Sequence, residues 1–193
     1  MKRIIFASKN EGKVREVRKI LDDLNVQILS LSDVDYTISI EETGITFEEN
    51  AKIKADVIYK EYKIPVIADD SGLTVEQLNG EPGIYSARYA GPSAADEENN
   101  LKLLKNLEKF PQPHKAKFVC LAVYYFGTDF FTATGEVNGE IIKSPRGTKG
   151  FGYDPLFVPD NYDKTMAELK SEIKNKISHR FNAFSQLKKY IAK

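Results

Sequence analysis

The 193-residue chain has little of several features that mark whole classes of protein. Cys120 is its one cysteine, so no internal disulfide can form, and two histidines are too few to complete a structural zinc site. Lys plus Arg and Asp plus Glu both number 28, so the chain has no basic excess of the kind that nucleic-acid binders carry. We therefore expect no nucleic-acid partner, and any recognition of anions must come from a local group of residues.

Long hydrophobic runs are also missing. The longest, Phe118–Phe126, falls far short of the roughly 20 apolar residues that span a bilayer. The apolar part of the N-terminus, Ile4–Ala7, is too short for a signal peptide. We expect a cytoplasmic protein with no membrane partner, in which Cys120 is a small core residue of a strand and His114, after Pro111-Gln112-Pro113, is a solvated loop residue.

Hydrophobic periodicity predicts an α/β fold with a mixed β-sheet, because helices and strands alternate first and an antiparallel unit follows. Apolar residues at helical spacing predict a helix from Lys13, and a capping box at Thr46-Phe47-Glu48-Glu49 predicts the start of a second. The other expected elements are strands at Ile4–Ala7 and Val66–Ala68, a helix over Ala94–Leu107, a hairpin of Phe118–Phe126 with Phe130–Val137, a tight turn at Asn138-Gly139, and a last helix from about His179.

The common phosphate-binding motifs are absent: there is no G-x-x-x-x-G-K-[ST] and no G-x-G-x-x-G. Instead, a strand leads through Ser8-Lys9-Asn10-Glu11-Gly12-Lys13 into a helix. The free N–H groups and positive dipole end of that helix, together with the charge of Lys13, can hold phosphate. The same residues also fit a plain helix cap followed by an exposed lysine.

Carboxylates come in two adjacent pairs, Glu41-Glu42 and Asp69-Asp70. Mg²⁺ in phosphate enzymes is held by one or two carboxylates together with water and substrate phosphates. In extended chain, neighbouring side chains point to opposite faces, so only one member of each pair can reach a common metal. Solvated loop acids or helix caps are the alternative interpretation of each pair.

Two further segments combine features suited to a nucleotide. Gly147–Pro155 has glycines that let a ligand approach the backbone and aromatic residues whose faces can stack a base; a glycine-rich turn with its aromatics in the core is the alternative. Ser178-His179-Arg180 places basic side chains at a helix N-terminus, with Lys174 one turn upstream. The helix dipole opposes a cation there, which favours an anionic or acceptor partner.

Taken together, these segments resemble the inosine/xanthosine triphosphate pyrophosphatases, a family that hydrolyses non-standard purine nucleoside triphosphates. The matching stretches run in family order over nearly the whole chain: Ser8–Lys13, Glu41–Ala55, Ala68–Leu73, Gly80–Gly91, Gly150–Pro155 and Ser178–Arg180.

The resemblance implies one domain over residues 1–193, an elongated mixed sheet with flanking helices and two lobes around a central cleft, and a homodimer. It implies Mg²⁺-dependent hydrolysis of ITP, dITP and XTP to the monophosphate and pyrophosphate by attack of water on the α-phosphorus. Asp70 would be the general base and a metal ligand, and Glu41 the favoured second metal ligand, with Glu42 left open. Lys54 would be a further phosphate contact. The substrate-binding residues implied are Ser8, Lys9, Asn10, Glu11, Gly12, Lys13, Ser71, Phe151, Gly152, Tyr153, Asp154, Lys174, His179 and Arg180.

Two other functions are weighed against this one. A septum-inhibitor-type pyrophosphatase acting on pyrimidine or modified nucleotides would open with a Ser-x-Ser-Pro-Arg-Arg-like stretch, which this chain lacks. A nucleotide-binding sensor without catalysis would be expected to lose its base, whereas Asp69, Asp70 and Lys13 are all present.

Overall fold

The computed structural model describes residues 1–34 and 36–192 and has an α/β fold with a mixed six-stranded sheet, as predicted. The strand order is β2-β1-β3-β4-β5-β6; β1 pairs in parallel with β2 and β3, and β5 pairs antiparallel with β6. The strands are Lys2–Phe6 (β1), Val26–Ser30 (β2), Val66–Val75 (β3), His114–Tyr125 (β4), Phe130–Ile141 (β5) and Phe157–Pro159 (β6). The helices are Glu11–Ile20 (α1), Phe47–Tyr62 (α2), Asp96–Leu107 (α3), Ser171–Ile177 (α4) and His179–Ile191 (α5), with short 3₁₀ turns at Glu76–Leu78 and Gly83–Arg88.

The chain forms two compact units. Unit 1 consists of residues 1–70, 120–135 and 179–193, and unit 2 of residues 71–119 and 136–178. The chain passes from one unit to the other inside β3, β4 and β5, and again between α4 and α5.

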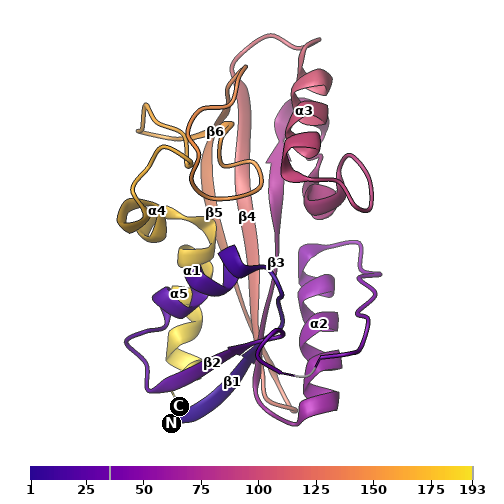
Figure 1. Cartoon of the computed structure of the whole chain (residues 1–193), viewed down its shortest axis with the longest axis vertical. Helices are drawn as coiled ribbons and strands as arrows, with labels where there is room; N and C mark the ends of the chain where they lie inside the picture. The colour runs from indigo at the N-terminus through magenta and orange to yellow at the C-terminus, as the bar shows by residue number, and fades with distance from the viewer. Residues whose placement is uncertain (35, 193) are drawn as a thin grey trace. The chain divides into compact units, whose positions relative to one another are not determined.

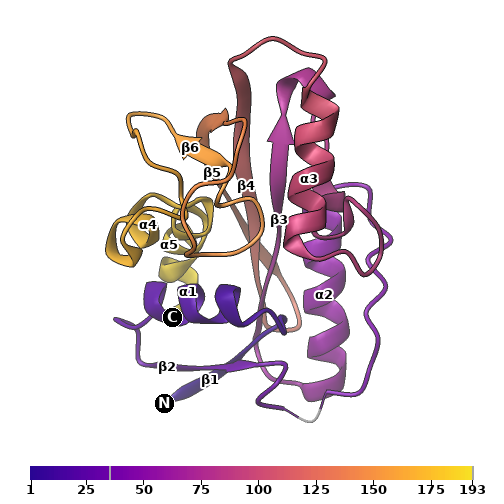
Figure 2. The ribbon, with the colours of Figure 1, turned by 45° about the horizontal axis from the view of Figure 1, so that its top comes forward.

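In unit 1, strand alternation divides the core into two layers (Figures 1 and 2). Ile4 and Phe6 of β1 pack with the buried faces of α1 and α5, whereas Ile5 packs with α2. The predicted last helix is confirmed as α5, and its inward face consists of Phe184, Leu187 and Ile191, each at most 1% exposed. Both faces of these strands are therefore apolar, as expected of a sheet covered by helices on both sides.

Unit 2 has its own core beneath α3, which packs along the part of the sheet that lies in this unit (Figure 2). Leu103 and Leu107 of α3 are buried against Leu73 of β3 and Phe118 of β4. Phe118 also packs against Phe157 of β6, with ring centroids 4.6 Å apart. These contacts anchor α3 through its C-terminal half and leave its first turn at the surface.

Side-chain caps fix where the first two helices begin. The side chain of Asn10 accepts a hydrogen bond from the backbone N–H of Lys13, so α1 starts at Glu11, two residues before the predicted start. Thr46 accepts a hydrogen bond from the N–H of Glu49, and the predicted N-cap of α2 is confirmed.

Two local predictions are wrong. His114 is no solvated loop residue: β4 begins at this position, its side chain is 5% exposed, and burial lowers the pKa of its imidazole. Asn138-Gly139 is not a turn, because β5 continues to Ile141 and Gly139 lies opposite Pro159 of β6. A Cβ on Gly139 would lie 2.2 Å from the carbonyl oxygen of Val158, so this glycine serves close strand packing.

Among the helices of the described residues, none combines the length and the apolar character needed to cross a bilayer.

Candidate active site

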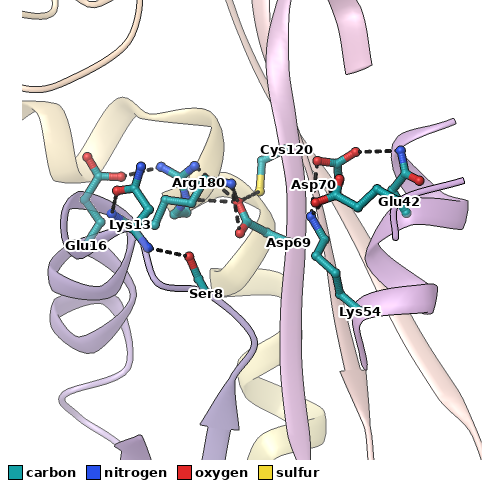
Figure 3. Close-up of polar contacts among 11 residues, drawn as sticks. Ser8, Lys13, Glu16, Glu42, Lys54, Asp69, Asp70, Cys120 and Arg180 are labelled. Carbon is teal, nitrogen blue, oxygen red and sulfur yellow. Dashed lines mark hydrogen bonds and ion pairs between the residues drawn. The ribbon is translucent and has the colours of Figure 1, made fainter. Parts of the chain in front are cut away.

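Asp69 and Asp70 lie side by side in the middle of β3 and point to opposite sides of the strand (Figure 3). This confirms the expectation for adjacent residues in extended chain. Asp69 is 2% exposed and Asp70 is 7% exposed, so both carboxylates need partners inside the protein. The two carboxylates have different partners, and all of these partners lie in unit 1.

Asp69 lies between two cations. Lys13 Nζ is 3.0 Å from Asp69 Oδ2, and Arg180 reaches the same oxygen with Nε at 3.3 Å and Nη2 at 3.2 Å. The remaining guanidinium nitrogen, Nη1, lies 2.5 Å from Glu16 Oε2. Arg180 is 1% exposed and is thus enclosed by two carboxylates. The Cys120 thiol lies 3.8 Å from Asp69 Oδ2.

The charges in this cluster support one another. Burial by itself would raise the pKa of Asp69, but Lys13, Arg180 and Lys54 outweigh it and hold the pKa of this carboxyl well below its usual range. Burial would lower the pKa of Arg180, but Asp69 and Glu16 keep it above its ordinary value. Burial, followed by the charge of Asp69, raises the pKa of the Cys120 thiol. At neutral pH the cluster therefore contains ionised Asp69 and Arg180 beside an unreactive thiol.

Asp70, on the other side of β3, faces α2. Lys54 Nζ lies 3.3 Å from Asp70 Oδ1 and 3.5 Å from Glu42 Oε2, and Asn50 Nδ2 donates to Asp70 Oδ2 over 3.3 Å. Asn50 and Lys54 are four residues apart on α2, so one helix face supplies both contacts. Glu41, by contrast, is exposed.

The surroundings of Asp70 affect its pKa in the opposite direction from those of Asp69. Burial raises the pKa of Asp70; Lys54 and Lys13 oppose this rise, and Glu42 and Asp69 add to it. Burial would lower the pKa of Lys54, but Asp70, Asp69 and Glu42 raise it instead. Asp70 is thus a carboxylate that binds a proton more readily than usual, beside a lysine that keeps its own.

The segment between β1 and α1 forms a tight turn. The N–H of Asn10 donates to Ser8 Oγ over 3.1 Å, and the Asn10 side chain caps α1. The first N–H groups of a helix have no partner within that helix, and the positive end of its dipole lies there. Lys9 projects over the ring of Tyr36, with its ammonium 4.8 Å from the ring centre, and Glu11 and Gly12 form the start of the helix.

In unit 2, the predicted base-binding residues form a second group. Asp154 Oδ2 accepts hydrogen bonds from the N–H of Phe151 over 2.9 Å and from Lys174 Nζ over 2.7 Å. The same ammonium lies 4.9 Å from the centre of the Phe151 ring. Tyr153 is buried, and its hydroxyl donates to the carbonyl of Ser86 over 2.8 Å. The aromatic ring and the cation that a purine could use are thus adjacent.

The predicted residues are brought together within their units. Unit 1 unites Lys13, Asp70, Lys54 and Arg180 around β3, and unit 2 unites Phe151–Asp154 with Lys174. His179 is buried at the start of α5, where a Cβ on Gly135 would lie 2.1 Å from its carbonyl oxygen. Ser71 is half-buried and follows Asp70 on β3.

Glu16 also belongs to the candidate site, although no sequence motif indicated it. It lies in α1 among charged residues that resemble a solvated face, yet it is only 9% exposed because it pairs with Arg180. Its spacing of three residues from Lys13 places both on one helix face, and this is the signal that could have found it.

Comparison with known proteins decides the family. Residues 4–190 match the model of the Ham1 family.

The chain belongs to the Ham1 family.

Its relatives in this family match it over almost their whole length. A dITP/XTP pyrophosphatase of Bacillus licheniformis is 53% identical over 189 residues, covering 97% of this chain and 96% of that protein. A protein of the same name from Bacillus subtilis is 48% identical over 193 residues, covering 99% of this chain and 98% of the relative.

Solved Ham1 structures have the same fold. The Staphylococcus aureus Ham1 protein superposes with a TM-score of 0.87 at 44% identity and 98% coverage of both chains. A Ham1 protein from Coxiella burnetii gives a TM-score of 0.90 at 40% identity, covering 99% of this chain and 98% of that one.

Proposed function

We propose that this chain hydrolyses non-standard purine nucleoside triphosphates (ITP, dITP and XTP) to the monophosphate and pyrophosphate. The observation that carries the proposal is Asp70, a buried carboxylate with a raised pKa that lies against Lys54 in a chain of the Ham1 family. Relatives at about half identity are named dITP/XTP pyrophosphatases, which supports the substrate class. The family resemblance also leads us to propose a homodimer located in the cytoplasm.

We propose Asp70 and Glu42 as the protein ligands of Mg²⁺. In the described residues there is no group of three or more His, Cys, Asp or Glu side chains that could hold a metal. Two carboxylates nevertheless fit Mg²⁺, which takes one or two of them and fills its other positions with water and phosphate oxygens. Asp70 and Glu42 both lie within 3.5 Å of the Lys54 ammonium, so their oxygens already converge on positive charge. This geometry favours Glu42 over Glu41.

Asp70 fits the general base. A base is most effective when its pKa lies near the working pH, and burial moves the pKa of Asp70 in that direction. In the proposed step, the water oxygen bonds to the α-phosphorus, the bond from that phosphorus to the bridging oxygen breaks, and pyrophosphate leaves. The proton of the water passes to the Asp70 carboxylate. Bound Mg²⁺ would lower the pKa of the water and stabilise charge on the phosphates.

The phosphates would be held by the turn before α1. Backbone N–H groups at the start of α1 and the ammonium of Lys13 supply positive charge where negative charge develops on the leaving group. Asp69 holds the Lys13 side chain in place, since its carboxylate lies 3.0 Å from the ammonium. Lys54 supplies a second cation beside the base.

The purine base of the substrate would be held by Phe151 and neighbouring polar groups. An aromatic face stacks on any purine and cannot distinguish one purine from another. Discrimination needs hydrogen bonds: hypoxanthine and xanthine have an acceptor at O6, where adenine has a donor. A pocket that offers donors there rejects adenine strongly, because its polar groups would be left unpaired. Lys174 and backbone N–H groups near Phe151, all within unit 2, are the proposed donors, with Ser71 and His179 as further substrate contacts.

A panel of nucleotides tests this function. We expect kcat/KM for ITP, dITP and XTP to exceed that for ATP by at least about a hundredfold, because a mismatched buried donor is costly. Release of pyrophosphate would be followed through added inorganic pyrophosphatase. In a separate arm with excess EDTA, the monophosphate would be measured directly by chromatography, because the coupling enzyme also needs Mg²⁺, and its formation should stop. Preference for pyrimidine nucleotides would instead indicate the septum-inhibitor type, and binding without turnover would indicate a sensor.

A further inference from the structure

The backbone of Gly152, inside the predicted base-binding segment, is held by side chains from α3. The N–H of Gly152 donates to Asp96 Oδ2 over 2.6 Å, and Asn100 Nδ2 donates to the carbonyl of Gly152 over 3.0 Å. Asp96 and Asn100 are four residues apart and therefore lie on the same face of α3. Both polar backbone groups of one loop residue are thus satisfied by one helix face.

These contacts fix the backbone on both sides of Phe151. The N–H of Phe151 donates to Asp154, and the next N–H along the chain, that of Gly152, donates to Asp96. Gly152 has a φ of 62°, a left-handed conformation that favours glycine over other residues. Tyr153 then enters the core of unit 2, where its hydroxyl bonds to Ser86. Hydrogen bonds therefore restrain the backbone that carries the Phe151 ring.

Neither side chain is needed to hold α3 in place. The helix is anchored by Leu103 and Leu107, which are at most 1% exposed, whereas Asp96 is exposed at its first turn. The cap of the helix comes from Glu98, which accepts a hydrogen bond from the N–H of Ala95 over 2.7 Å. The need to hold α3 in place therefore does not explain why both Asp96 and Asn100 bond to Gly152.

We propose that Asp96 and Asn100 are positioning residues of the purine site: they hold Gly152 so that the Phe151 ring is preset to stack on the base. This proposal rests on the proposed function. A loop that is ordered before binding costs less entropy when the substrate binds, so the pair should act on affinity. Their proposed effect is on the loop that holds the purine and not on the water or the phosphates, so the chemical step should be largely unaffected.

The test compares binding of the two halves of the substrate. Asp96→Ala and Asn100→Ala should each raise KM for ITP and Kd for IMP by about tenfold, the usual effect of one hydrogen bond involving a charged or buried group. The change in kcat should stay within about threefold, and Kd for inorganic pyrophosphate with Mg²⁺ should not change, because pyrophosphate does not use Phe151.

Conservative variants separate the hydrogen bonds from packing. Asp96→Asn keeps an acceptor oxygen and should restore most of the affinity. Asn100→Asp is nearly the same size but replaces the donor by a carboxylate facing the Gly152 carbonyl, so it should bind IMP at least as weakly as Asn100→Ala. Glu97→Gln is the matched control, since it removes a charge from the same exposed first turn and should behave as wild type.

Melting temperatures would be measured for every variant. Equal losses of IMP and pyrophosphate affinity, an Asp96→Asn variant as weak as Asp96→Ala, or an Asp96→Ala variant no different from Glu97→Gln would each overturn the proposal. The wild-type affinity for IMP and its turnover of ITP test the proposed function by themselves, whereas the ratios between variants and wild type test the role of this pair.

Discussion

Replacing Asp70 by asparagine should lower kcat for ITP by about 10²–10⁴-fold, the usual contribution of a general base. The amide has almost the same shape but cannot take the proton of the attacking water. Loss of the negative charge also weakens the proposed Mg²⁺ site that Asp70 forms with Glu42. Steady-state kinetics at saturating ITP and Mg²⁺ measure the effect, and a variant that keeps more than about a tenth of wild-type kcat would show that Asp70 is not the base.

The Glu41-Glu42 pair provides a control for this result. Glu42→Gln should raise the Mg²⁺ concentration needed for half-maximal activity, because Glu42 shares Lys54 with Asp70. Glu41→Gln removes the same charge one residue away on an exposed side chain and should leave the Mg²⁺ dependence unchanged. Thermal melting of each variant would confirm that the fold is intact.

Replacing Asp69 by asparagine should destabilise the protein by about 3–5 kcal/mol at pH 7, because the change leaves the fully buried Arg180 and the half-buried Lys13 without their shared carboxylate. Urea unfolding without added metal measures the free energy. Asp23→Asn is the control: it removes an exposed partner of Lys188 and should have far less effect. A wild-type-like unfolding midpoint for Asp69→Asn would contradict the role given to this cluster.

The difference in unfolding free energy between wild type and Asp69→Asn should depend on pH, and the direction of this dependence follows from the pKa of Asp69. The pKa of Asp69 is lower in the folded chain than its ordinary value of about 3.9. The ionised carboxylate therefore contributes its full stabilisation above about pH 4, and the contribution is lost as the pH falls below that value. The gap between wild type and Asp69→Asn should be constant from pH 7 down to about 5 and should narrow under more acidic conditions.

Local sequence patterns were sufficient for the elements that surround the site. Helical periodicity and caps located α1, α2 and α5, because the signals lie within a few residues of each other. Strand alternation also predicted that Asp69 and Asp70 would face opposite ways. The prediction ended β3 at Ala68, whereas the strand continues to Val75, because the buried acids have cationic partners supplied by α1, α2 and α5.

What the sequence could not provide depends on contacts between distant residues. Glu16 is a site residue only because Arg180, which lies 164 positions away, reaches it. The choice between Glu41 and Glu42 depends on which side chain meets Lys54. Gly139 looks like a turn residue until β6 is placed against it, and nothing local predicts that strand of three residues. Asp96 and Asn100 likewise resemble ordinary surface residues of α3 until the loop at Gly152 is seen to lie on them.

The position of bond cleavage tests the central claim most directly. Hydrolysis of ITP in ¹⁸O-labelled water, followed by mass spectrometry of the products, shows which phosphorus the water attacks. Attack at the α-phosphorus, as proposed for water activated beside Asp70, would place the label in IMP and leave the pyrophosphate unlabelled. Label in pyrophosphate or in inorganic phosphate, with pyrophosphatase absent from the assay, would contradict it.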